Sequence, residues 1–132
     1  SSLIQRKTVS LLKREKAWHP SMRAKEVTIL KSEPGCEKQK RHFDFPVSDP
    51  PCLSKGVLFS LQKGTTFLTY SSVSGRERRH KLEMGDAFVF DGGTEHAGDS
   101  FQDENYRIHV YVDSSLDSSK REKGRTYFRS KI

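Results

Sequence analysis

The sequence has few of the features that place a chain in a membrane or a disulfide framework. No run approaches the roughly 20 apolar residues that a bilayer-spanning helix needs, and the charged residues 1–18 contain no signal-peptide core. Its two cysteines, Cys36 and Cys52, are too few for a disulfide scaffold and lack the CxxC spacing of zinc and redox sites. We therefore expect an intracellular protein, cytoplasmic or nuclear, that has no membrane partner. The sequence leaves open whether the two cysteines pair.

Hydrophobic residues are also scarce, at 33% of the 132-residue chain, while charged residues make up 31%. This composition is polar for a globular protein, but it does not reach the low-hydrophobicity, high-charge range in which chains fail to fold. The length suits one domain, because domains mostly have roughly 100–150 residues. We expect a small domain, monomeric or weakly oligomeric, with disordered ends.

Most of the chain consists of short segments rich in β-branched and aromatic residues, separated by Gly, Pro and Asp turns. The clearest of these segments are residues 27–30, 41–45, 56–62, 65–70, 87–90 and 105–112. About seven or eight short strands at spacings of roughly 8–12 residues favour an all-β sandwich or barrel. The first 20 residues are compatible with one short amphipathic helix or an irregular lead-in, which ends before Pro20.

One alternating segment carries metal-binding residue types. His42 and Asp44 flank a single residue of an extended segment, so their side chains project to the same face. His96, in the Gly-rich residues 92–98, is the best candidate for a third ligand. Two histidines and one carboxylate form the facial triad of non-haem Fe(II) oxygenases, in which further coordination positions stay open. The alternative is that each residue is a surface or hydrogen-bonded group, because a His-x-Asp pair is common.

Arg107 adds a second kind of chemistry. It follows His96 by 107 − 96 = 11 residues and shares one face of a strand-like segment with His109 and Tyr111. A guanidinium binds a carboxylate through two parallel hydrogen bonds. We therefore expect Arg107 to bind an anionic co-substrate inside the barrel.

Together these residues resemble the Fe(II)- and 2-oxoglutarate-dependent dioxygenase family. The resemblance lies in His42-x-Asp44, in His96 within a His-Ala-Gly stretch and in Arg107-x-His109. It implies an all-β, double-stranded β-helix fold, a jelly roll like that of cupins, after a short helical or irregular lead-in. The division expected from it is a lead-in at residues 1–25, a catalytic core at residues 26–113 and a basic tail at residues 114–132.

The resemblance also implies roles for individual residues. His42, Asp44 and His96 would hold Fe(II), and Arg107 would bind the 5-carboxylate of 2-oxoglutarate. Four further residues are expected near the co-substrate: His109, Tyr111, Gln39 and Thr66. The implied reaction consumes dioxygen, decarboxylates 2-oxoglutarate to succinate and hydroxylates or demethylates a substrate.

The excess of positive charge bears on the substrate. A formal charge of +7 is concentrated partly in two clusters, within residues 76–81 and 120–131. Such clusters neutralise phosphates when they form one patch, whereas a solvated loop and a disordered tail would carry the same charge without binding. The substrate therefore stays open between a protein side chain, a small molecule and a nucleic acid.

Two other functions fit the same residues. One is a jelly-roll module that binds nucleic acid or an acidic partner through the basic clusters and turns over no 2-oxoglutarate. The other is a cupin-like metalloenzyme that uses no 2-oxo acid, in which Arg107 would have no co-substrate to bind.

Overall fold

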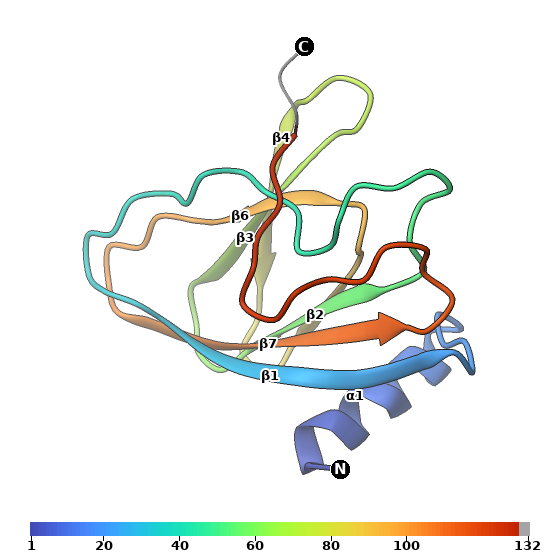
Figure 1. Ribbon diagram of the computed structural model, residues 1–132. Helices are drawn as coiled ribbons and strands as arrows, with labels where there is room; N and C mark the ends of the chain where they lie inside the picture. The colour runs from blue at the N-terminus through green and yellow to red at the C-terminus, as the bar shows by residue number, and fades with distance from the viewer. Residues whose placement is uncertain (130–132) are drawn as a thin grey trace.

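The computed structural model describes residues 1–129. Two antiparallel sheets face each other, and one N-terminal helix packs against the larger sheet (Figure 1). The four-stranded sheet has the order β1-β7-β2-β5 and consists of β1 (Met22–Ser32), β2 (Lys55–Ser60), β5 (Ala87–Asp91) and β7 (Asn105–Ser114). The three-stranded sheet has the order β4-β3-β6 and consists of β3 (Thr65–Tyr70), β4 (Glu77–Leu82) and β6 (Glu95–Gly98). Both sheets contribute to one apolar cluster between them, so the all-β architecture expected from the sequence is confirmed.

Helix α1 (Leu3–Arg14) begins in a capping box and covers the outer face of the larger sheet (Figure 1). Its Leu12 is fully buried against Val110 and Val112 of β7, and a buried leucine side chain contributes about 2 kcal/mol. The helix ends earlier than Pro20, because Lys16 has a φ of +57° that no α-helix accommodates. Among the described residues, no helix is both long enough and apolar enough to cross a membrane.

Strand β7 separates the apolar core from the interior polar residues. It pairs with β1 on one side and with β2 on the other. Val110 and Val112 face α1, and the alternate residues Arg107, His109 and Tyr111 face the space between the sheets. The face of β7 that looks polar in the sequence is therefore an interior face.

Residues 76–81, expected as a solvated loop, are largely a strand instead. Glu77–Leu82 forms β4, which pairs with β3 along its whole length. Its charged side chains are tolerated because β4 is an edge strand with neighbours on one side only. Backbone pairing has overridden a side-chain pattern that has no strand-like apolar face.

The end of the chain is ordered where the sequence predicts disorder. Arg121 donates through Nε and Nη2 to the carboxylate of Asp113, at 2.9 and 3.0 Å. Farther on, Tyr127 and Phe43 exchange backbone hydrogen bonds of 2.8 and 2.6 Å. The expectation of a disordered tail was therefore wrong for residues 121–129, since a buried ion pair and backbone pairing hold them; residues 130–132 lie outside the described residues.

Both cysteines are free thiols in the structure. Burial raises the pKa of the Cys52 thiol to about 11, so this thiol is protonated at neutral pH.

Gly56 lies so close to an aromatic ring that a larger side chain does not fit there. Opposite it in the β2–β5 pair stands Phe90, and a methyl group on Gly56 would lie 2.2 Å from Phe90 Cζ. We expect Gly56→Ala to lower the free energy of unfolding by about 2 kcal/mol, as overpacking does, in urea unfolding. Gly93→Ala is the control, because nothing lies within 4 Å of its added methyl, and it should change stability by less than about 0.5 kcal/mol. Equal losses in the two variants would contradict this explanation.

Candidate metal centre

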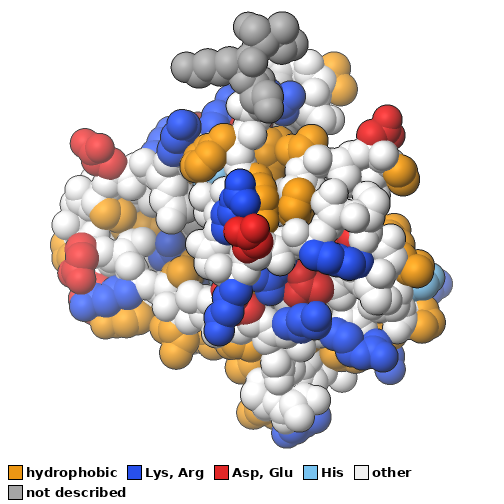
Figure 2. Space-filling view, viewed as in Figure 1, with side chains coloured by type: hydrophobic (Ala, Val, Ile, Leu, Met, Phe, Trp, Pro, Cys, Tyr) orange, Lys and Arg blue, Asp and Glu red, His pale blue; other side chains and the backbone are white. Residues whose placement is uncertain are grey.

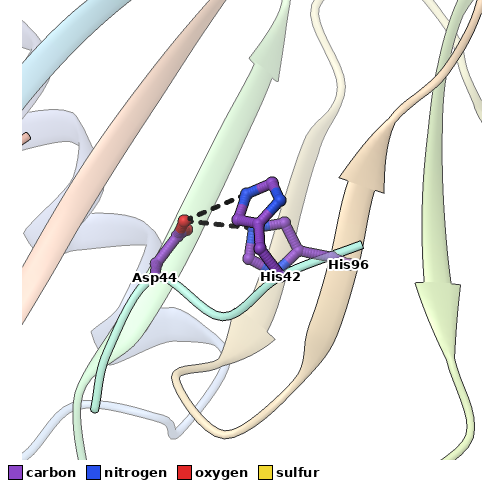
Figure 3. Close-up of side chains that lie close together, drawn as sticks. All are labelled: His42, Asp44 and His96. Carbon is purple, nitrogen blue, oxygen red and sulfur yellow. Dashed lines mark ion pairs between the residues drawn. The ribbon is translucent and has the colours of Figure 1, made fainter. Parts of the chain in front are cut away.

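The structure brings His42, Asp44 and His96 together at one end of the space between the sheets (Figure 3). One ligand atom from each lies within 4.8 Å of the other two. His96 Nε2 is 3.2 Å and His42 Nε2 is 3.6 Å from Asp44 Oδ1. All three side chains are almost completely buried. The spacing of His42 and Asp44 predicts that these two share a face, and the structure adds His96 to them.

Backbone pairing places the two histidines side by side. His42 and His96 form an antiparallel bridge in which each amide donates to the other carbonyl oxygen at 2.9 Å. His96 belongs to β6, whereas His42 lies on an extended segment that is not a regular strand. Asp44 follows two residues later and still projects to the same side, because alternation of side chains is a property of any extended backbone.

Hydrogen bonds set both imidazole rings in the form that binds metals. His42 Nδ1 lies 2.8 Å from the carbonyl oxygen of Lys40, and His96 Nδ1 lies 2.9 Å from that of Thr94. A carbonyl oxygen only accepts, so each Nδ1 carries the proton and donates it. The Nε2 atom of each ring is then left facing Asp44, as in metal sites whose second histidine nitrogen is bound to a backbone carbonyl.

The charges at the centre favour a cation. Burial lowers the pKa of His42, which keeps its ring neutral. Burial alone would raise the pKa of Asp44, but the neighbouring His109 and His96 hold that pKa well below its usual range. The cluster therefore places an ionised carboxylate beside the neutral ring of His42.

His109 completes the surroundings of Asp44 from β7. Its Nε2 lies 3.1 Å from Asp44 Oδ2, yet within the described part of the chain both buried atoms lack a hydrogen bond of acceptable geometry. Unpaired buried polar atoms are costly, typically about 1–3 kcal/mol each. The donor set and these two unsatisfied atoms fit a metal ion with nitrogen and oxygen ligands.

A cavity of about 140 Å³ adjoins the cluster. Arg107 lines the cavity and is only 4% exposed. Its Nη1 donates to Ser32 Oγ at 3.0 Å and to Asn105 Oδ1 at 3.4 Å, and its guanidinium lies over the Phe101 ring, 5.1 Å from the ring centre. Within residues 1–129, Arg107 forms no salt bridge with a carboxylate. Burial lowers the pKa of Arg107. Burying a charge without a counter-charge is costly, so an anion placed beside Arg107 in this cavity would lower that cost.

The remaining predicted site residues divide into two groups. Gln39 and Tyr111 line the same cavity, and Gln39 Oε1 accepts a hydrogen bond of 2.8 Å from the Gly98 amide. Thr66 lies instead at a separate surface depression, where its Oγ1 donates to Asp99 Oδ2 at 2.8 Å. Neighbouring β3 residues alternate between the two sides of the sheet, so a difference of one position along the strand moves a threonine from one side to the other.

Several cavity residues carry no signal in the sequence. They are strand residues of ordinary type, and one residue of the tail: Thr28, Leu30, Leu58, Phe67 and Thr126. Nothing distinguishes such residues from other strand or tail positions until the sheets are packed.

Lys and Arg side chains do not form one uninterrupted patch on the face seen in Figure 2, where acidic side chains lie among them. Arg79 of β4 pairs with Asp99 at 2.7 Å. Lys38 pairs with Glu77 at 3.1 Å. Part of the charge that suggested a nucleic-acid surface is thus neutralised within the protein.

Comparisons with known proteins support the fold. No protein-family model and no curated protein matches the sequence. Among solved structures, a prolyl-4-hydroxylase from Pseudomonas putida matches with a TM-score of 0.57 and 14% identity, over 90% of this chain and 63% of that one. The cupin domain of Drosophila melanogaster CENP-C matches with a TM-score of 0.50 and 13% identity, over 71% of both chains. The protein therefore has a cupin-type jelly-roll fold, and it spans less than two thirds of the hydroxylase.

Proposed function

We propose that the protein is an Fe(II)- and 2-oxoglutarate-dependent dioxygenase that hydroxylates or demethylates a substrate. The observation that carries this proposal is that a single cavity holds two complementary groups. One is the His42, Asp44 and His96 cluster, which needs a cation, and the other is the buried Arg107, which has no carboxylate partner among the described residues. A small dicarboxylate bound between a metal and a guanidinium satisfies both.

The roles of the residues follow from their surroundings. His42, Asp44 and His96 would hold iron, which when bound activates dioxygen for the oxidation of a C–H bond. Arg107 binds the 5-carboxylate of 2-oxoglutarate and so fixes the direction in which the molecule lies. Apolar neighbours such as Leu58 and Phe67 keep water out of the cavity.

His109 is the positioning residue for Asp44 in this proposal. It contacts the carboxylate oxygen Oδ2, while His42 and His96 contact Oδ1. Its ring stacks on Phe90 with the two planes 17° apart, and packing on both sides restricts how it can turn. In this proposal His109 therefore holds the carboxylate in one orientation, which is one of the two roles that the sequence suggested for it, the other being contact with the co-substrate.

Succinate production tests the proposal directly. The protein with Fe(II), 2-oxoglutarate and dioxygen is expected to form succinate, measured by proton NMR. His42→Ala should lower that rate at least about 100-fold, because a lost ligand costs more than the 10–100-fold loss typical of outer partners. His80→Ala is the matched control, since His80 Nε2 lies 2.8 Å from Thr69 Oγ1 on the β3–β4 pair and does not line the cavity. Turnover by His42→Ala at the parent rate would refute the assignment.

A further inference from the structure

The tail reaches the metal centre from a buried anchor. The Arg121 guanidinium stacks over Tyr111, 4.1 Å from the ring centre, while it pairs with Asp113. Beyond this anchor the chain runs beside the segment that carries His42 and Asp44 (Figure 1), and its Thr126 is one of the residues that line the cavity. The tail is thus fixed at its base and laid over the site.

The register of this contact is specific. Phe43, the residue between His42 and Asp44, exchanges both backbone hydrogen bonds with Tyr127. In an antiparallel pair, residues on either side of such a position also face each other. Phe128 lies near His42, with 6.5 Å between their ring centres, and Thr126, which is exposed, is among the residues that line the cavity.

Residues 125–129 are held more weakly than the strands of the core. Of residues 125–129, only Tyr127 is partly buried, and the other side chains are exposed. Within residues 1–129, the backbone hydrogen bonds between residues 125–129 and the segment that carries His42 and Asp44 are the two between Phe43 and Tyr127. The Arg129–Glu95 ion pair, at 3.3 Å, involves an exposed guanidinium, and such pairs contribute little.

We propose that the backbone of Phe43 is the docking edge for an extended peptide, and that residues 125–129 are a tethered occupant of that edge. The inference rests on the proposed function and names its substrate class: a protein segment that adds a strand beside the metal centre and places one small side chain in the cavity. The tail occupies this place until a peptide displaces it.

The features of the edge select a peptide rather than a small molecule. An adjacent amide and carbonyl of one residue are satisfied together by another backbone, which is how strand addition gains affinity. The cavity of about 140 Å³ admits a small side chain opposite Asp44. The buried carboxylate of Glu95 pairs with Arg41 at 2.7 Å and also with Arg129 of the tail at 3.3 Å, so a basic peptide residue at the position of Arg129 would be its second cationic partner.

Peptide binding to full-length variants tests the inference. The probe is a fluorescein-labelled peptide of residues 122–129, and binding is followed by fluorescence polarisation. Tyr127→Pro removes the amide that donates to Phe43 and should release the tail, so the variant is expected to bind the peptide at least about ten-fold more tightly than the parent, whose own strand competes at a millimolar effective concentration. Tyr127→Phe keeps the amide and should bind like the parent.

A second peptide isolates the backbone contact. The same peptide N-methylated at the position of Tyr127 cannot donate to Phe43, and it should bind Tyr127→Pro at least about ten-fold more weakly. Equal affinity of all three proteins, or of both peptides for Tyr127→Pro, overturns the inference. The assay needs neither iron nor 2-oxoglutarate, so a protein that forms succinate but fails these tests refutes only the docking edge.

Amide exchange in the parent protein needs no variant. The Phe43 amide, bound to Tyr127, is expected to exchange at least about ten-fold faster than the His42 amide, bound to His96, because a displaceable strand opens more often than the core bridge. Equal protection of the two amides would show that the tail is a permanent part of the fold, which overturns the inference as well.

Discussion

Asp44→Asn is expected to abolish the stabilisation of the protein by divalent metal. In the parent, Mn(II) or anaerobic Fe(II) at about 100 times its Kd should add about 2.7 kcal/mol of stability, because the ion binds only the folded state. Asparagine has nearly the shape of aspartate but no negative charge, and its amide nitrogen cannot ligate. We expect the metal affinity to fall at least about 100-fold, which is more than removal of a residue that only supports a ligand usually causes. The shift in the unfolding midpoint should therefore disappear.

Asp99→Asn is the matched control for Asp44→Asn. Asp99 is another buried aspartate, 4% exposed, but it pairs with Arg79 and Thr66 outside the cavity. This variant is expected to lower stability without metal, because it weakens the pair with Arg79, and to keep the full metal shift. If Asp44→Asn kept the same shift, the cluster would be a hydrogen-bonded polar core and not a metal centre.

Arg107→Met is expected to raise the KM for 2-oxoglutarate roughly 100-fold. Methionine keeps an unbranched side chain of similar reach and leaves no charge in the cavity. Loss of one partner of a buried charge pair costs about 3 kcal/mol, which corresponds to roughly a 100-fold change in binding. Initial rates of succinate formation at varied 2-oxoglutarate measure the effect, and the metal-dependent shift in stability should stay unchanged because Arg107 contacts none of the three proposed ligands in the structure.

Arg107→Lys separates charge from geometry at the same position. Lysine keeps the positive charge but not the planar fork that matches a carboxylate, so its KM should rise less than that of Arg107→Met. An unchanged KM in Arg107→Met, together with normal metal binding, would favour the cupin-like metalloenzyme that uses no 2-oxo acid.

The sequence places His42 and Asp44 on one face for a local reason. His42 and Asp44 needed only extended backbone between them to face the same way, and they do so although residues 41–45 form no regular strand. Arg107 and His109 were likewise placed on one face by alternation along β7. Each of these inferences depends on two residues at short separation.

The predictions that failed concern contacts between distant segments. Residues 77–82 carry no apolar alternation, and only the presence of β3 beside them makes them a strand. Thr66 faces away from the cavity because of the register of β3 in its sheet. Such pairings depend on the whole fold, and local propensity does not specify them.

The β-rich class of the fold, the shared face of His42 and Asp44 and the shared face of Arg107 and His109 follow from the sequence alone, because side chains alternate with a period of two along an extended chain. Tertiary structure alone decided that the rings of His42 and His96 meet through a backbone bridge, that Arg107 is buried with only neutral partners among the described residues, and that the tail lies on Phe43. The physical reason is that hydrogen-bonded register and burial arise only when segments far apart in the chain pack together.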